Sequence, residues 1–257
     1  MKYICGAYTD AGIHKKTNQD SLAIRIADTE QGQIAFAILC DGMGGLANGE
    51  LASATVIKMF TDWFENDHIS VIKSSNNMDV FIQECNRIIQ ECNRKLYQYG
   101  KERKTQLGTT MVMCLVYENH YYVANIGDSR MYLINMDYCN QITEDQSLVA
   151  REVRAGRLTE EAAEKDSRRN ILLQCIGVTE EVKPEYYSGN LAVNNMIMLC
   201  SDGFRHELSK KEINDYLNPV RNNNENDITN SIQTAIQIIK KRKEKDNISA
   251  LSIKAIG

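Results

Sequence analysis

The sequence predicts an α+β fold with largely antiparallel sheets. Three observations lead to this prediction: strand-like and helix-like segments come in blocks rather than in strict alternation, strand patterns dominate residues 109–142, and two long segments show helical spacing. The 257 residues are enough to bury a substantial core. With 43% apolar and 25% charged residues, the composition is that of an ordinary soluble globular protein.

The first half of the chain is expected to contain a hairpin followed by two helices. Residues 20–27 and 33–40 are apolar runs joined by a polar turn at 28–32, so we expect two paired strands. Residues 48–66 and 78–99 have the spacing of amphipathic helices. The polar segment 70–77 between them is expected to be a linker.

The second half begins with strands and ends with a mixture of both elements. Runs at 110–117, 121–125, 130–135 and up to 142 predict an antiparallel meander. Residues 144–170 are highly charged and are expected to form surface helix and loop, as a flap would. Further strands are expected at 186–191, 196–200 and 248–253, and further helices at 209–217 and 227–243.

Charge and cysteine usage exclude several classes of protein. The net charge of −4 gives no pull toward nucleic acid or an anionic membrane, and the longest apolar run, about seven residues, is too short to span a bilayer. The first residues lack the apolar core of a signal peptide, so we expect a cytoplasmic protein. The eight cysteines form no Cys-x-x-Cys pair, and the four histidines lack zinc spacing, so we expect free, buried thiols.

Three aspartates stand where apolar runs meet the surface. Residues 34–40 lead into Asp41, residues 196–200 lead through one serine into Asp202, and Asp246 stands just before the run at 248–253. Carboxylates at the ends of buried strands are costly to desolvate unless a cation meets them. If the three strand ends converge, the natural partner is a hard divalent metal ion, which prefers oxygen ligands.

The glycine-rich turn after Asp41 superficially matches a dinucleotide-binding fingerprint. The carboxylate of Asp41 argues against that interpretation, because it would face a pyrophosphate of the same sign. We interpret the glycines as letting backbone atoms, including the carbonyl of Gly42, approach a metal. The sequence contains no P-loop, EF-hand loop or Gly-x-Ser-x-Gly elbow.

Six short motifs follow one another along the chain: Thr17-Asn-Gln-Asp20, Asp41-Gly-Met-Gly-Gly45, Leu107-Gly-Thr-Thr110, Gly127-Asp-Ser-Arg130, Ser201-Asp-Gly203 and Asp246-Asn247. In this order and spacing, from about residue 3 to residue 253, the chain resembles the metal-dependent serine/threonine protein phosphatases of type 2C, in particular bacterial members. The resemblance implies a β-sandwich of two mainly antiparallel sheets with helices on both outer faces. It also implies a single catalytic domain over residues 1–257, a flap-like insertion at about 144–180, and a metal centre at one end of the sandwich.

The resemblance assigns the ligands of that metal centre, which would hold Mg²⁺ or Mn²⁺. Asp41 would bridge two ions, and the carbonyl of Gly42 would add a further ligand. Asp202 and Asp246 would complete the set for the first ion. Asp128 is similar to the ligand of a third, weaker ion in bacterial members, so two or three ions are implied. Asp41, Asp202 and Asp246 are therefore the residues expected to be essential for catalysis.

The resemblance also assigns residues around the metal ligands. Gln19, Asp20 and Asn247 would hold metal-bound water rather than the ions themselves. Lys15 stands where the family usually has an arginine that grips the substrate phosphate, and a lysine offers a point charge instead of a bidentate fork.

The chain departs from the familiar pattern elsewhere. Gln19 replaces a common glutamate, Met43 stands where animal members carry a histidine thought to protonate the leaving group, and Asp166-Ser167 replaces the usual His-Pro of the flap. These departures leave open the proton donor and the role of the flap.

The implied function is metal-dependent hydrolysis of phosphoserine or phosphothreonine on proteins, through water activated by two ions about 3.5–4 Å apart. Its partners would be the phosphorylated substrates of a serine/threonine kinase, with no nucleic acid and no membrane involved, and we expect a monomer. The alternative is a catalytically impaired pseudophosphatase that binds phosphoproteins as a regulator, suggested by Gln19 and Lys15. The intact Asp41, Asp202 and Asp246 count against that alternative.

Overall fold

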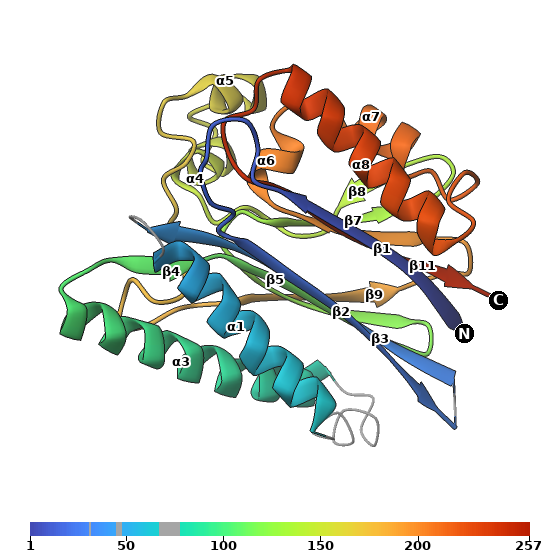
Figure 1. The fold of residues 1–257 in the computed structure, drawn as a ribbon, viewed down its shortest axis with the longest axis horizontal. Coiled ribbons are helices and arrows are strands. Elements are labelled where there is room, and N and C mark those ends of the chain that lie inside the picture. The colour runs from blue at the N-terminus through green and yellow to red at the C-terminus, as the bar shows by residue number, and fades with distance from the viewer. Residues whose placement is uncertain (31, 45–47, 67–77) are drawn as a thin grey trace.

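A computed structural model describes residues 1–30, 32–44, 48–66 and 78–257 of the chain. The predicted linker at 70–77, Gly45 of the first aspartate motif and residue 31 of the predicted turn lie outside the described residues. Within the described part, two sheets stack face to face, and helices cover the outer face of each (Figure 1). The sequence prediction of an α+β fold with antiparallel sheets is confirmed.

The first sheet contains five strands in the order β1-β11-β10-β7-β8, and every neighbouring pair is antiparallel. Its strands are β1 (Lys2–Asp10), β7 (Arg130–Ile134), β8 (Cys139–Gln141), β10 (Met196–Cys200) and β11 (Ile248–Ile256). Sequence analysis missed β1, whose residues are mostly half-buried and so lack a continuous apolar run.

The second sheet contains six strands, five of them in the order β2-β3-β5-β6-β9, with β4 paired to the end of β3. Its strands are β2 (Asp20–Thr29), β3 (Gly32–Gly44), β4 (Leu107–Thr109), β5 (Met111–Tyr117), β6 (His120–Ile126) and β9 (Glu185–Asn190). The predicted pairing of 20–27 with 33–40 is confirmed, because β2 and β3 pair antiparallel along their whole length.

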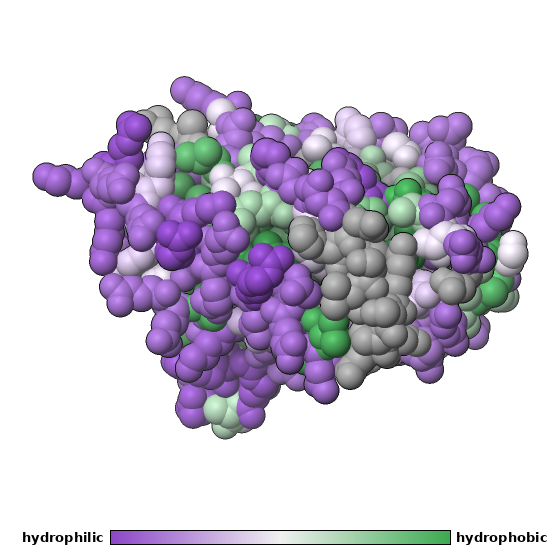
Figure 2. Space-filling view, turned by 90° about the horizontal axis from the view of Figure 1, so that it is seen from below, coloured by the Kyte–Doolittle hydropathy of each residue, from purple (hydrophilic) through white to green (hydrophobic). Residues whose placement is uncertain are grey.

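The helices lie outside the sandwich and at one of its ends. They are α1 (Asn48–Glu65), α3 (Met78–Arg103), α4 (Leu148–Arg154), α5 (Glu160–Lys165), α6 (Asp202–Arg205), α7 (Lys210–Tyr216) and α8 (Glu225–Lys241). Helices α1 and α3 cover the second sheet, whereas α7 and α8 cover the first (Figure 1). The surface seen from the side of α1 and α3 is mostly hydrophilic outside the grey atoms (Figure 2).

The long apolar run of β3 is explained by burial on both faces. Ala35, Ala37 and Leu39 point into the core between the sheets. Phe36 and Ile38 point the other way, into the core under α1 and α3. A strand covered on both faces reads as a continuous apolar run rather than as an alternating one.

The predicted meander over residues 109–142 is wrong. β5 pairs with β6, as expected, but β7 and β8 belong to the other sheet. The apolar pattern indicates that a strand is buried but not which sheet it joins, since either sheet would bury it equally well. The chain crosses from one sheet to the other between β6 and β7, and this crossing carries Asp128 to the end of the sandwich.

All eight cysteines are free thiols, and seven of them are buried. Among the residues described, no helix combines the length and the apolar character needed to cross a bilayer.

Candidate active site

Five aspartates gather at the end of the sandwich where strands of both sheets terminate. Asp20 begins β2 and lies opposite Asp41 of β3. Asp128 lies between β6 and β7, Asp202 begins α6 directly after β10, and Asp246 precedes β11. Each of the other four raises the pKa of Asp41, so the five carboxylates share one electrostatic environment.

Two glycines allow the backbone segments of this site to approach closely. A Cβ atom on Gly42 would lie 2.2 Å from the carbonyl oxygen of Gly49 and 2.6 Å from that of Gln19. A Cβ atom on Gly203 would lie 2.2 Å from the carbonyl oxygen of Asn247. The glycine after each aspartate is therefore required by contact between neighbouring chain segments.

Hydroxyl groups tie the aspartate-bearing segments together in pairs. The backbone N–H of Asp41 donates to Oγ1 of Thr110 at 3.0 Å, and Thr110 Oγ1 lies 2.7 Å from Oγ of Ser129. This links β3 to the turn that carries Asp128.

Ser201 and Ser249 form a second link, between the segment that carries Asp202 and the strand that follows Asp246. The Ser201 N–H donates to the carbonyl of Ser249, and the Ser249 N–H donates to Oγ of Ser201, both at 3.1 Å. Sequence analysis quoted the motifs that contain Thr110, Ser129 and Ser201 but assigned these residues no role.

The half of the site formed by Asp20 and Asp41 carries unpaired negative charge. Burial, followed by the charges of the neighbouring carboxylates, raises the pKa of Asp41 well above its usual value. Burial likewise raises the pKa of Asp20 to about 7. Neither carboxylate oxygen of Asp20 has a hydrogen-bond partner of ordinary geometry among the described residues, although the hydroxyls of Ser249 and Ser201 lower its pKa in part against the effect of burial.

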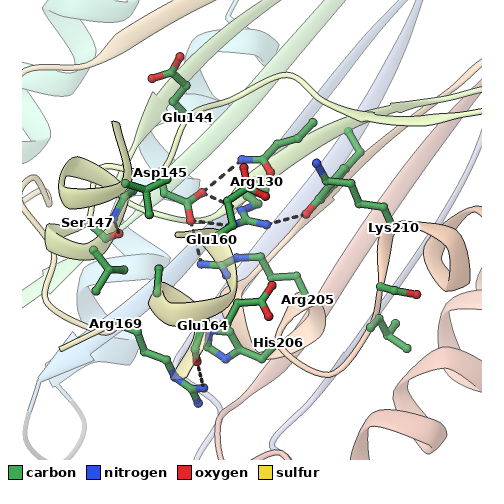
Figure 3. Close-up of a pocket in the computed structure, with 18 of the residues that line it drawn as sticks. Arg130, Glu144, Asp145, Ser147, Glu160, Glu164, Arg169, Arg205, His206 and Lys210 are labelled. Atoms are coloured by element: carbon green, nitrogen blue, oxygen red, sulfur yellow. Dashed lines mark hydrogen bonds and ion pairs between the residues drawn. The ribbon is translucent and has the colours of Figure 1, made fainter. Parts of the chain in front are cut away.

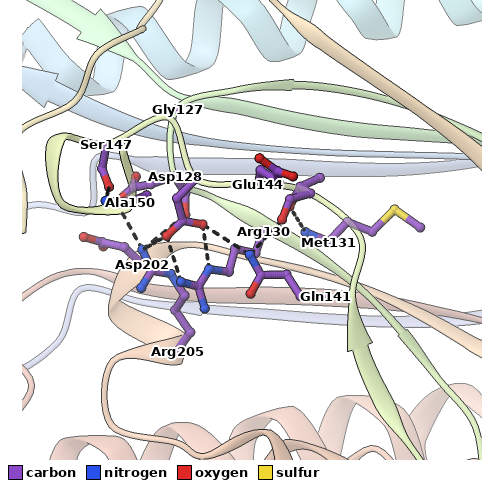
Figure 4. A network of polar contacts seen from close by, with 12 residues as sticks. Gly127, Asp128, Arg130, Met131, Gln141, Glu144, Ser147, Ala150, Asp202 and Arg205 are labelled. Carbon is purple, nitrogen blue, oxygen red and sulfur yellow. Dashed lines mark hydrogen bonds and ion pairs between the residues drawn. The ribbon is translucent and has the colours of Figure 1, made fainter. Parts of the chain in front are cut away.

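In the other half, every carboxylate meets a cationic or basic side chain of the protein. Lys15 Nζ lies 2.9 Å from Asp246 Oδ1, and Arg205 Nη2 lies 3.2 Å from Asp128 Oδ2 (Figure 4). His206 Nε2 lies 3.7 Å from Asp202 Oδ2.

Asn247 holds the loop that carries Lys15. Its Oδ1 accepts from the backbone N–H of Gln19 at 2.9 Å, and its Nδ2 donates to the carbonyls of Ala11 and Thr17 at 3.0 and 3.1 Å. The side-chain amide of Gln19 reaches the carbonyl of Gly44 at 3.4 Å. The expected role of Asn247 and Gln19 toward metal-bound water stays a prediction. What the structure adds is that Asn247 positions the loop that carries Lys15.

The donors at this site fit a hard divalent cation. They are oxygens, and the buried oxygens Asp20 Oδ1, Asp20 Oδ2 and Asp202 Oδ1 have no partner among the residues that the structure covers. Among the same described residues, no group of three histidine, cysteine, aspartate or glutamate side chains is arranged so that it could hold a metal ion.

A cavity of about 360 Å³ adjoins the site on the side of α4 and α5 (Figure 3). Arg130, Asp145, Arg205 and His206 line it, so its wall includes two side chains that contact the aspartates. The predicted flap supplies α4, α5 and the loop beyond them.

In the flap, Asp166 stabilises the turn that contains Arg168. Its carboxylate binds the side chain and the backbone N–H of Arg168, and these hydrogen bonds lower the pKa of Asp166 to about 2.

The family comparison and the structural comparisons agree with this geometry. The model of the family described as protein phosphatase 2C matches residues 12–237. The serine/threonine phosphatase stp of Listeria innocua is 30% identical over 215 residues, covering 83% of this chain and 82% of its own length. The structure of the S. agalactiae serine/threonine phosphatase superposes with a TM-score of 0.85 at 28% identity, covering 99% of this chain and 100% of its own.

A third solved structure, the catalytic domain of the serine threonine protein phosphatase PstP in complex with two manganese ions, shares the fold. Its TM-score is 0.80 at 24% identity, with both chains covered completely. The family match spans most of the sequence, and the aspartates of five of the six motifs meet at one end of the sandwich. The chain therefore belongs to the protein phosphatase 2C family, as a protein serine/threonine phosphatase of the bacterial type.

Proposed function

We propose that this protein hydrolyses phosphoserine and phosphothreonine on proteins with two divalent ions, Mg²⁺ or Mn²⁺. Asp41, Asp202, Asp246 and the carbonyl of Gly42 would hold the two ions, and Asp128 would offer a weaker third position. The observation that carries the proposal is the gathering of five aspartates at one end of the sandwich, where burial and then the four other carboxylates raise the pKa of Asp41. The manganese complex of PstP supports the number of ions.

The bound ions would supply activation of water for in-line attack on phosphorus and neutralisation of the charge that develops there. The protein itself supplies an anion-binding group. The side chain of Lys15 is 43% exposed, and its amino group lies 2.9 Å from Asp246. Burial works against its charge, but the hydrogen bond to Asp246 and the charges of Asp246, Asp41 and Asp202 raise the pKa of Lys15. Lys15 is therefore protonated and would bind a phosphate oxygen as a point charge.

The same proposal covers substrates and location. An open end of a sandwich suits a phosphorylated peptide segment better than a small molecule that needs enclosure. We propose phosphorylated cytoplasmic proteins, the products of a serine/threonine kinase, as the substrates, and residues 144–180 as a flap beside them. A single monomeric catalytic domain over residues 1–257 remains part of this proposal.

The alternative is a phosphoprotein-binding regulator without turnover. One observation favours it: Lys15, His206 and Arg205 already contact Asp246, Asp202 and Asp128, so these carboxylates have partners without an ion. Turnover separates the two functions, since a binding protein would retain a phosphopeptide in Mn²⁺ without releasing phosphate.

Substitution of the proposed ligands tests the function. Asp41→Asn, Asp202→Asn and Asp246→Asn should each abolish Mn²⁺-dependent hydrolysis of an aryl phosphate while the circular dichroism spectrum is kept. Asp62→Asn is the matched control, because the same change is made on the exposed face of α1, where Asp62 pairs with Lys58. Full activity in all three site variants would overturn the proposal.

A further inference from the structure

Four charged side chains, between 6% and 22% exposed, form a row that leads from the cavity to the active site (Figure 3, Figure 4). Arg130 holds Asp145 with two hydrogen bonds of 2.7 Å, from Nε to Oδ1 and from Nη2 to Oδ2. Arg205 Nη2 lies 3.3 Å from the same Asp145 Oδ2 and 3.2 Å from Asp128 Oδ2. The charges alternate along the row, so Arg205 is the cation shared between two carboxylates.

The sequence of α6 places this cation beside Asp128. Asp202 and Arg205 are three residues apart and lie about one turn from each other, so one short helix presents a proposed metal ligand and a guanidinium to the same site. Arg205 Nη2 also lies 3.4 Å from the backbone carbonyl of Asp128. The side chains of Arg205 and Asp128 are 12% and 6% exposed, so water screens their attraction only weakly.

We propose that the Arg205 guanidinium is a built-in cation of this phosphatase, which occupies Asp128 and competes with a third metal ion there. The inference rests on the proposed two-ion function. Arg205 does not lose its proton under ordinary conditions, so an ion at Asp128 either meets the repulsion of a neighbouring positive charge or has to displace the guanidinium. The wild-type protein then binds two ions tightly and the third weakly.

The pairing of Lys15 with Asp246 differs from that of Arg205 with Asp128. The Lys15 side chain is 43% exposed, and Asp246 is its only ion-pair partner among the described residues, so an incoming ion or phosphate can draw it away at small cost. Arg205 is held by two buried carboxylates, one of which Arg130 fixes.

The displaced guanidinium has space to move. Arg205 lines the cavity of about 360 Å³, whose wall also carries Glu160 and Glu164 on α5 (Figure 3). Arg205 Nε has no hydrogen-bond partner among the residues described, so the side chain loses no hydrogen bond at that atom when it moves. Displacement is therefore sterically open and is opposed mainly by charge.

Counting bound ions without using activity tests the inference. Titration with Mn²⁺, followed by the electron paramagnetic resonance signal of the free ion, should give two tight sites and one weak site in the wild-type protein. Arg205→Gln should tighten the weak site at least tenfold, and adding Asp128→Asn to that variant should remove the gain. Arg154→Gln is the matched control, because Arg154 lines the same cavity but pairs with Glu144 at 2.8 Å instead of with Asp128, and it should titrate like the wild type.

A crystal of the wild-type protein in millimolar Mn²⁺ gives a test that needs no variant to fold. Anomalous scattering should show two ions among Asp41, Asp202 and Asp246, with Arg205 still on Asp128. A third ion at Asp128 with the occupancy of the other two, or an unchanged weak site in folded Arg205→Gln, would overturn the inference. Loss of the two tight sites in the wild type would instead overturn the proposed function.

Discussion

The acidic site has two halves, which differ in whether basic side chains of the protein lie beside the aspartates. Asp20 and Asp41, both on the second sheet, have no cationic partner among the described residues, and their pKa values are raised. Asp128, Asp202 and Asp246 each lie beside a basic side chain of the protein. The difference indicates where a metal ion contributes most, because only the first half lacks a basic side chain within ion-pair distance among the described residues, although burial raises the pKa of Asp128 to about 7 as well.

The largest test of this comparison sets Asp41→Asn against Asp128→Asn. Loss of Asp41 should lower kcat/KM by about a thousandfold, because the charge stabilisation lost with a metal ligand is worth several kcal/mol and each 1.4 kcal/mol is tenfold. Loss of Asp128 should lower it by less than about tenfold, since Arg205 already offsets that carboxylate. Phosphopeptide kinetics in Mn²⁺ measure both, and equal losses would show that the two halves do not differ.

The pH dependence of the metal-free protein tests the unpaired half. Because the pKa of Asp20 is raised to about 7 and that of Asp41 is also raised, the folded protein holds more protons than the unfolded chain above about pH 4. Stability should therefore fall as the pH rises from about 4 to 7, with a loss in Tm on the order of 5 °C.

One carboxylate of the paired half belongs to the same window, because burial raises the pKa of Asp128 to about 7 even beside Arg205. Glu244, which lies 3.5 Å from His206, does not: burial works against its charge, but hydrogen bonds lower its pKa to about 2, so its contribution is lost only in stronger acid. Thermal unfolding followed by circular dichroism at pH 5 and pH 8, in a chelator, measures the effect. Asp20→Asn should flatten the pH dependence, and a profile as steep as that of the wild type would exclude Asp20 as its source.

Thr110→Val sharpens the comparison by cutting the link between the halves. Valine keeps the shape of threonine but removes the hydroxyl that accepts from Asp41 N–H and contacts Ser129. Leaving buried polar groups without partners should lower the free energy of unfolding by about 2 kcal/mol. Urea titration measures this change, and Thr234→Val on the exposed face of α8 is the control. An unchanged midpoint in Thr110→Val would mean that the halves are held together by other contacts.

Much of the secondary structure could be predicted from the sequence, because the pattern of apolar residues in a segment depends on that segment alone. The apolar runs and the helical spacing of 48–66 and 78–99 correspond to β2, β3, α1 and α3, because burial on a face leaves a local periodicity. The partner of a strand is a property of the whole chain, and for this reason the meander prediction failed at β7. The edge strand β1, half-buried along its length, leaves only a weak pattern.

The site shows the same division. Aspartates at strand ends could be predicted to meet, because a buried strand must deliver such a carboxylate to the surface at a sheet end. The residues that balance them could not be predicted so easily. Arg205 and His206 follow the Ser201-Asp-Gly203 motif after one residue, Phe204, but it is the single turn of α6 that brings them back to the carboxylates. The signal was present in the spacing of three residues between Asp202 and Arg205, which places both side chains on one side of a helix.

Lys15→Arg gives the smallest expected effect and tests the paired half at its exposed edge. Arginine can bind a phosphate with two parallel hydrogen bonds, whereas lysine offers one point charge, so KM for a phosphopeptide should fall severalfold with little change in kcat. Steady-state kinetics on one phosphopeptide measure this, with Lys16→Arg, one residue along the same loop, as the control. If KM is unchanged or higher, Lys15 does not contact the substrate phosphate. Its role is then to pair with Asp246, as Arg205 pairs with Asp128.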